Sequence, residues 1–540
     1  MTDLFRDAPA AATTAARAPS ARTSLAGGLG RALAGLAAIL AVGFSSGAAR
    51  ADAAADAAMR ARNAVPALED AIGRGMQMYG VPGAAVAVVA GGEVVYAKGF
   101  GVRAAGGAPV DTGTVFQIGS ATKAFLATTL AQMVDEKKFE WDTRVIGLAP
   151  EFALHDPWVT REFRVYDLLA QRSGLRPYVH DGLAALGYDA GALIQSLRFA
   201  EPVTSFRSTF AYVNIPHLEA GRIVAAAAGK KEWSEVAAER IFTPLGMTST
   251  STTAEAIEAA ANHAVGHRWT LDGVTAIPFD PSFPYALGPA GNINSNVDDM
   301  THWLRTLLAG GIYDGKRIVG VGALAYTQVP KVAINEQQSY AMGWVIHETP
   351  NGRIVWHNGG TNGFGAHVGL VPHLGIGIVV LSNEENRGFP DGVAATFYQT
   401  LLGNPSFDVL AAGLEHARKS EEEARAKFVA PAAPRPARDL AVYAARYNTL
   451  GLGAAVVAVE DGRLVLRLAE TGAALELTPF DGDVFTVRLR PEGSFARVVE
   501  AWGSEPMGFA QFQIDIDGRL ADLRWSLGED SFLFDRVEER

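Results

Sequence analysis

A serine and a lysine stand three residues apart at Ser120 and Lys123, in an apolar stretch that runs from Phe116 to Phe125. At the start of a helix this spacing puts both side chains on one face, so that the amine can reach the hydroxyl. A serine becomes a nucleophile when a neighbour takes its proton, and burial lowers the pKa of a lysine toward the range that suits this task. A helix-capping serine followed by a surface lysine is the simpler interpretation of the pair taken alone.

A second pair, Tyr212 and Asn214, forms the only Tyr-x-Asn of the sequence and precedes a helix-like run at 218–228. In a turn, two such residues can project into one cleft and offer a phenol and an amide. A phenol with a pKa near 10 serves as acid or base if a cation lowers that pKa, and Lys123 is the expected cation. The alternative is a half-buried tyrosine beside a turn asparagine.

A third group, His357, Gly359 and Gly360, follows an apolar strand and precedes another. Glycines there would let a substrate approach the strand edge, and the N–H groups of Gly360 and Ser120 would together hold an oxyanion. The His357 imidazole could bind a carboxylate or polarise a carbonyl. A histidine at the end of a strand beside a glycine-rich turn is otherwise ordinary.

The elements that must position these residues begin with two short strands around Gly91-Gly92, a hairpin signal. Helical patterns follow at 121–135 and 218–228, and strand-like runs return at 354–357, 366–371 and 376–382. Strands at both ends with helices between them predict α+β or mixed α/β layers, in which the first and last strands share one sheet.

The C-terminal part has a different composition. Residues 411–438 are rich in Ala, Glu, Lys and Arg and then in proline, which predicts a helical stem and a linker. Six short apolar or alternating runs follow, separated by Gly, Asp and Asn, and they predict a small antiparallel barrel or sandwich.

Composition narrows the classes of partner and compartment. The 540 residues carry a net charge of -11, which argues against nucleic acid, and contain no cysteine. Arginines at 17, 22 and 31 precede an uncharged run at 32–49, so we expect residues 1–51 to be a signal peptide cleaved between Ala51 and Asp52. The mature protein would be exported, in the periplasm, without stable membrane insertion. The alternative is an uncleaved N-terminal anchor.

Taken together and in this order, the three groups resemble the motifs of the serine β-lactamase and penicillin-binding-protein superfamily, and more narrowly its class C β-lactamase and DD-peptidase branch. The resemblance covers residues 65–402. It implies a β-lactamase-like α/β sandwich with a central antiparallel sheet and a helical domain over residues 60–408. It also implies attack by Ser120, proton transfer by Lys123 and Tyr212, a substrate amide held by Asn214, and neither metal nor organic cofactor. After a stem at 409–437, residues 438–540 resemble a lipocalin-like β-barrel.

One departure from the family pattern bears on the substrate. Class C β-lactamases carry Lys-Thr-Gly where this chain has His357-Asn358-Gly359, so an ammonium is replaced by an imidazole that is mostly neutral at pH 7. The resemblance therefore favours DD-carboxypeptidase, D-aminopeptidase or esterase activity on a small molecule or peptide, with weak β-lactamase activity left open. A homo-oligomer is also left open. The rival hypothesis is a non-catalytic penicillin-recognising or peptidoglycan-binding module, which has no need of Ser120, Lys123 and Tyr212 together.

Overall fold

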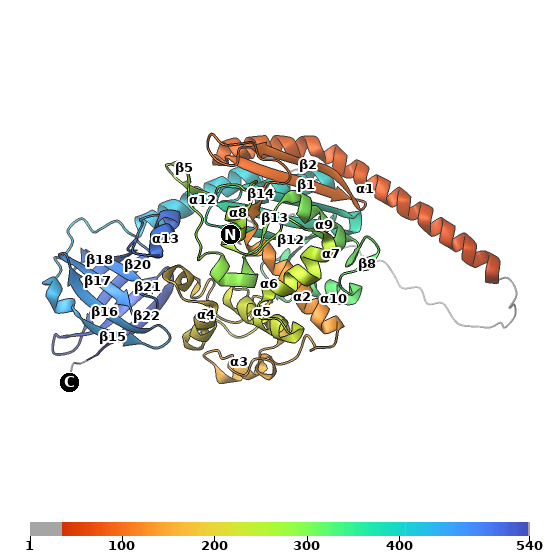
Figure 1. The fold of residues 1–540 in the computed structure, drawn as a ribbon. Coiled ribbons are helices and arrows are strands. Elements are labelled where there is room, and N and C mark those ends of the chain that lie inside the picture. The colour runs from red at the N-terminus through yellow and green to blue at the C-terminus, as the bar shows by residue number, and fades with distance from the viewer. Residues whose placement is uncertain (1–34, 405–406, 538–540) are drawn as a thin grey trace, which may run out of the picture.

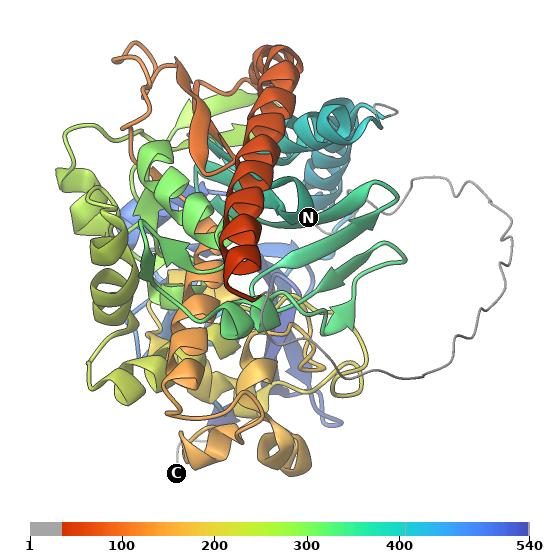
Figure 2. The same cartoon turned by 90° about the vertical axis from the view of Figure 1, so that its right-hand side faces the viewer.

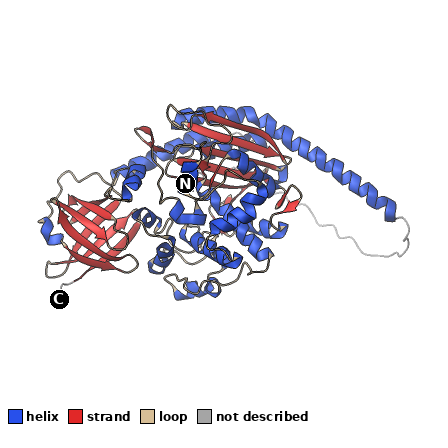
Figure 3. Ribbon diagram, in the orientation of Figure 1, coloured by secondary structure: helices blue, strands red, loops and turns tan. Residues whose placement is uncertain are grey.

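The computed structural model describes residues 35–404 and 407–537, with side chains from residue 52 onward. At its centre an eight-stranded antiparallel sheet lies between two layers of helices (Figures 1 and 3). Its strand order is β2-β1-β14-β13-β12-β11-β10-β9. The strands are β1 (Gly83–Ala90), β2 (Glu93–Gly101), β9 (Val332–Ala333), β10 (Gln338–Tyr340), β11 (Val345–Thr349), β12 (Gly352–Thr361), β13 (Phe364–Val371) and β14 (Ile376–Ser382).

The first and last strands of the sheet are neighbours, as the sequence predicts. β1 pairs antiparallel with β14, from Ala84 opposite Ser382 to Ala90 opposite Ile376. Every residue of β1 is buried, because helices cover both faces of the sheet. Its side chains alternate between the two cores on either side, so the β-lactamase-like sandwich is confirmed.

Two sets of helices cover the sheet. One face packs against α1 (Gly35–Tyr79), α11 (Phe389–Leu402) and α12 (Val409–Ala426), and Figure 2 shows α1 running along this face. On the other face α9 (Val297–Leu308) packs against β1 and β14, and α2 (Thr122–Asp135) and α5 (Ile215–Ala228) pack against each other within the same core. The shorter helices lie outside the core that α1, α11 and α12 share with the sheet: α3 (Pro157–Glu162), α4 (Ala190–Ser196), α6 (Trp233–Ala237), α7 (Thr243–Leu245), α8 (Ala254–Ala259) and α10 (Val321–Thr327).

The N-terminal prediction falls largely outside the described residues. Of the expected signal peptide, only residues 35–51 are described, as the first part of α1. From residue 52 onward, where side chains are described, α1 packs through Ala54 near Gly91 and through Ala57 and Ala61 in the core on this face. Across residues 35–404 and 407–537, no helix is long and apolar enough to cross a membrane.

The C-terminal strands close into an eight-stranded barrel, with an apolar interior built around Trp525 and Phe512. The predicted stem is α12, and an extended segment with three prolines leads from it to the barrel. One helix within the barrel, α13 (Phe495–Trp502), was not expected from the sequence. The barrel strands are β15 (Ala445–Thr449), β16 (Gly453–Glu460), β17 (Arg463–Leu468), β18 (Ala474–Asp481), β19 (Val484–Leu489), β20 (Gly508–Ile514), β21 (Leu520–Leu527) and β22 (Asp530–Val537).

Candidate active site

Ser120 lies where a short strand turns into α2. The strand β3 (Phe116–Gln117) pairs with β6 (Asn294–Ser295), and a single 3₁₀ turn, Gly119–Ala121, then leads into the helix. Gly119 has a φ of +51°, and a Cβ at this position would lie 2.7 Å from the backbone nitrogen of Gly360. A glycine is therefore required here, because it permits both the left-handed backbone and the close approach to β12.

Lys123 is fully buried beneath Ser120. Its Nζ lies 3.0 Å from Ser120 Oγ, 2.7 Å from Asn214 Oδ1 and 2.8 Å from the carbonyl oxygen of Ala290. The amide and carbonyl oxygens can only accept hydrogen bonds, so they take two of the amine's protons. The remaining position of the nitrogen points at Ser120, and in the neutral amine this position is a lone pair. The geometry thus suits a base that takes the Ser120 proton.

Burial also sets the charge of Lys123. Desolvation lowers its pKa from 10.5 to about 7, and the buried carboxyl of Asp181 opposes this by raising it. Asn214 joins the two groups, because its Nδ2 donates to Asp181 Oδ2 at 2.5 Å while its Oδ1 accepts from Lys123. Burial raises the pKa of Asp181 to about 7. Near pH 7 the site therefore holds an appreciable fraction of neutral lysine.

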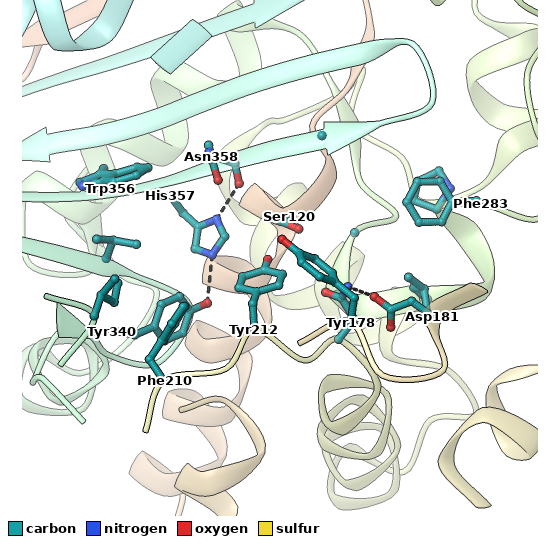
Figure 4. Close-up of a pocket in the computed structure, with 18 of the residues that line it drawn as sticks. Ser120, Tyr178, Asp181, Phe210, Tyr212, Phe283, Tyr340, Trp356, His357 and Asn358 are labelled. Atoms are coloured by element: carbon teal, nitrogen blue, oxygen red, sulfur yellow. Dashed lines mark hydrogen bonds between the residues drawn. The ribbon is translucent and has the colours of Figure 1, made fainter. Parts of the chain in front are cut away.

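The Tyr212 hydroxyl points toward Ser120 (Figure 4). Lys123 Nζ lies 4.8 Å from the centre of the phenol ring. The expectation that Lys123 lowers the Tyr212 pKa is wrong, since burial and the neighbouring Tyr340 raise that pKa well above 10. The amine lies over the face of the ring, and the hydroxyl makes no hydrogen bond of ordinary geometry within the described residues. Tyr212 is thus a neutral phenol that can donate a proton.

His357 lies inside a strand and not at its end, which corrects the sequence-based placement. β12 continues to Thr361, and β11 pairs with it only from Gly352 to Trp356. The edge of β12 from His357 onward is consequently unpaired on the β11 side and open to Ser120. The expected glycine-rich turn is a straight strand segment, because β13 pairs with it up to Thr361.

Both nitrogens of His357 are occupied. Nδ1 lies 2.6 Å from the carbonyl oxygen of Asn358, which can only accept, so Nδ1 carries the proton. Nε2 then accepts from the Tyr340 hydroxyl at 2.9 Å (Figure 4). Burial and the proximity of Lys123 lower the His357 pKa to about 3, so the ring is neutral. A neutral, fully bonded imidazole supplies no charge for a substrate carboxylate.

Gly359 and Gly360 bring β12 against the serine. A Cβ on Gly359 would lie 1.9 Å from the carbonyl oxygen of Ile118 and 3.1 Å from the nitrogen of Ser120, so no larger residue fits. The Gly359 carbonyl accepts a hydrogen bond from Asn386 Nδ2 at 2.9 Å. Because a trans peptide points its C=O and its N–H in opposite directions, this bond directs the Gly360 N–H away from Asn386, toward the cleft that Gly360 lines.

A buried polar network holds Asn386 in place. Asp391 accepts from Asn358 Nδ2 at 2.9 Å and lies 2.8 Å from His367 Nδ1, with Asn386 Nδ2 at 3.4 Å. His367 also contacts the Tyr398 hydroxyl at 3.0 Å and stacks on Trp356. The network therefore links α11 to the strand segment that faces Ser120.

The structure brings six of the seven predicted site residues to the lining or the floor of one cleft of about 170 Å³. Ser120, Tyr212, Asn214, His357 and Gly360 line it, Lys123 lies beneath Ser120, and Gly359 packs against the backbone of Ile118. Sequence reasoning missed Asp181, Tyr340 and Asn386. Asp181 and Tyr340 stand in segments without a motif, and Asn386 follows a strand at a spacing that carries no signal. Within the described residues, no group of three His, Cys, Asp or Glu could hold a metal ion.

The fold and the site define a class of protein. A model of the beta-lactamase family matches residues 68–401, and the chain belongs to this family. A second model, of a domain of unknown function (DUF3471), matches residues 429–538, which include the barrel. The protein is therefore a beta-lactamase family hydrolase with a C-terminal DUF3471 barrel, and the predicted superfamily is confirmed.

Relatives and solved structures resemble different parts of the chain. The chain is 27% identical over 492 residues to an unguisins hydrolase of Aspergillus campestris, a match that covers 84% of this chain and 89% of the relative. Penicillin-binding protein 4 of Amycolatopsis lactamdurans is 28% identical over 390 residues, which cover 69% and 94%. An octameric penicillin-binding protein homologue from Pyrococcus abyssi superposes with a TM-score of 0.57 at 21% identity, covering 87% and 100%. A class C beta lactamase from Rhodobacter sphaeroides gives 0.52 at 23%, covering 62% and 98%.

Proposed function

We propose that this chain is a serine hydrolase that forms an acyl-enzyme on Ser120 and cleaves amide or ester bonds of substrates that lack a carboxylate beside the scissile bond. The observation that carries the proposal is the set of contacts around Lys123. Two pure acceptors hold its amine so that the remaining position faces Ser120 Oγ, and its pKa is lowered to about 7. A binding module has no need of a buried, deprotonated lysine at this position.

The proposed reaction assigns one task to each residue. Neutral Lys123 takes the Ser120 proton as Oγ attacks the carbonyl carbon, and the N–H groups of Ser120 and Gly360 hold the resulting oxyanion. The Tyr212 phenol, neutral and directed at Ser120, passes a proton to the leaving group. Water then cleaves the acyl-enzyme, with Lys123 or Tyr212 accepting its proton. Asn214 keeps Lys123 oriented and also lines the cleft, where it can contact a substrate amide.

The lack of charge on His357 distinguishes between the candidate classes of substrate. A positive group would strengthen the binding of a substrate carboxylate, and His357 becomes charged only near pH 3, so among the candidate classes the carboxypeptidase and β-lactam substrates are less favoured than substrates without that carboxylate. The similarity to relatives named for unguisin hydrolysis supports a hydrolase in preference to a binding module. Peptides with blocked or distant carboxyl ends and short esters are therefore the proposed substrates, with β-lactam turnover slow.

The test uses the chain from Asp52 onward and p-nitrophenyl acetate. Wild-type protein should release p-nitrophenol with turnover, and both Ser120→Ala and Lys123→Met should fall about 1,000-fold or more in kcat/KM, because each removes a partner of the first proton transfer. Trapping of an acetylated Ser120 peptide by mass spectrometry completes the assignment. Equal activity of Ser120→Ala and wild type would reject the nucleophile.

We also propose that the protein is exported and cleaved near Ala51. The arginines at 17, 22 and 31 before the uncharged run at 32–49 support this proposal. N-terminal sequencing of protein recovered from a Gram-negative periplasm should begin at or near Asp52. A mature protein that retains residues 1–51 would favour the anchored alternative.

A further inference from the structure

A second cavity, of about 960 Å³, lies between the catalytic domain and the barrel. Its catalytic-domain side is formed by the loops around Tyr178, Phe210, Phe283 and Ile334. Its other side comes from the barrel, where the end of β19, helix α13 with the segment that follows it, and the β21–β22 turn contribute Arg488, Trp502, Met507 and Glu529. This volume falls at the upper end of the range that holds drug-sized ligands, whereas the cleft at Ser120 has room for a small group only.

The two cavities are continuous. Tyr178, Asp181, Phe210, Tyr212, Phe283 and Ile334 line both of them. Tyr212 faces Ser120 (Figure 4) and also lines the larger cavity. A substrate whose carbonyl reaches Ser120 can therefore extend past this tyrosine into the larger cavity. Phe283 stands on the far side of the same cleft, between the serine and the barrel.

The barrel wall is held in a fixed position. The Trp502 indole N–H donates to Asp280 Oδ2 at 2.6 Å, and the ring meets Phe283 edge to face at 5.7 Å between centroids. On the other side Asp530 accepts from the backbone N–H of His180 at 2.7 Å. Arg497 of α13 also pairs with Glu258 of the catalytic domain. A wall anchored at both ends can select substrates, because binding there costs little reorganisation.

The barrel side of the cavity combines the apolar surface of Trp502 with a negatively charged rim, formed by Glu505 and Glu529. Trp502 is 41% exposed although it is anchored by its N–H, so one face of the indole is open to a ligand. Of the cavity's charged residues, Arg488 is the cation and Asp181, Glu505, Glu529 and Asp530 are acids. Glu505 and Glu529 form no ion pair within the described part of the chain. The rim consequently favours a cationic or neutral ligand over an anionic one.

We propose that this cavity is the extended substrate subsite, and that it binds a peptide chain with a bulky apolar side chain against Trp502 and Phe283 and a basic or neutral group near Glu505 and Glu529. The inference rests on the proposed hydrolase function, which it deepens by naming a class of substrate. It assigns to the barrel the role of specificity wall. The occupant is the part of the substrate beyond the scissile bond, because the cavity opens directly into the catalytic cleft.

The test measures peptide binding against the ester reaction. Acetylated and amidated tripeptides Ala-Phe-Lys and Ala-Phe-Glu, each in L and D forms, are assayed as competitive inhibitors of p-nitrophenyl acetate hydrolysis. We expect the Lys peptide to bind about fivefold more tightly than the Glu peptide at low salt, with the difference narrowing in 1 M NaCl. Trp502→Ala should raise the inhibition constant of the Lys peptide about tenfold relative to KM for the ester.

Two further variants keep the outcome decisive. Trp158→Ala removes another exposed tryptophan, 56% exposed and not among the residues that line this cavity. It should leave the ratio of the Lys-peptide inhibition constant to the ester KM at its wild-type value. The pair Glu505→Lys and Glu529→Lys changes two exposed side chains, so folding is spared, and should reverse the preference between the Lys and Glu peptides.

The outcomes separate the two proposals. Ester hydrolysis that does not depend on Ser120 overturns the function itself. If ester hydrolysis depends on Ser120 but no peptide inhibits it, the hydrolase function stands and only the subsite is overturned. The same holds if Trp502→Ala and Trp158→Ala have the same effect on peptide inhibition. A preference for the Glu peptide in the wild type, or one that the double charge change leaves unaltered, also overturns the subsite.

Discussion

Lys123 sets the pH range in which Ser120 can be activated, and this gives the sharpest prediction. Lowering its pKa from 10.5 to about 7 means that burial disfavours the ammonium form by about 5 kcal/mol. A base with a pKa of about 7 is roughly 10% neutral at pH 6, 50% at pH 7 and 90% at pH 8. We therefore expect kcat/KM to rise about ninefold between pH 6 and 8 and then to level off.

The assay follows p-nitrophenyl acetate hydrolysis from pH 5 to 9 at constant ionic strength, with the Ser120→Ala rate subtracted at each pH. A lysine with its ordinary pKa would instead give a tenfold rise per pH unit through pH 9. That result would refute the assignment of Lys123 as a neutral base. Asp181→Asn supplies a second check, because the Asp181 charge raises the Lys123 pKa. Its removal should move the midpoint to lower pH, by about one unit.

Three further predictions concern the strand that faces Ser120. Asn386→Leu removes the donor to the Gly359 carbonyl and should lower kcat about tenfold with a much smaller change in KM. If Asn386 had a purely structural role, the substitution would lower the melting temperature without affecting kcat more than KM. Gly359→Ala forces a Cβ to 1.9 Å from Ile118 O and should lower kcat/KM about 100-fold together with Tm, while Gly147→Ala, with nothing within 4 Å, should change neither. The neutral His357 predicts that a peptide with an amidated C-terminus is cleaved at least as fast as the same peptide with a free carboxylate between pH 5 and 8, and a strong preference for the free acid would contradict it.

The sequence predicted most of the fold because the decisive signals are local. The predicted apolar run at 376–382 coincides with β14, and the short runs separated by Gly, Asp and Asn in the C-terminal part form the predicted antiparallel barrel. The continuation of β12 beyond His357 was missed, because Asn358, Gly359 and Gly360 have low strand propensity and only pairing with β13 extends the strand. Helix α13 was missed because it is short and lies among strands.

The candidate site could be predicted as a set of residues but not as a set of charge states. Ser120, Lys123, Tyr212 and Asn214 are identified by spacing. Their protonation depends on burial and on Asp181, which comes from a loop without a motif. The pKa of Tyr212 shows the limit most directly, since the position of Lys123 over the ring, and not beside the hydroxyl, cannot be inferred from sequence.

The pairing of β1 with β14 has a consequence for the order of folding. These strands are nearly 300 residues apart in the chain, and β1, whose other edge pairs with β2, has both edges paired only when β14 has joined it. Contacts between such distant segments form slowly, since a long loop must close before they stabilise anything. A chain emerging from the ribosome thus keeps the β1–β2 hairpin without its partner until residue 382 has been made. Because β12 joins β1 through β13 and β14, the strand segment that faces Ser120 belongs to the part of the sheet whose pairing with β1 depends on these distant residues.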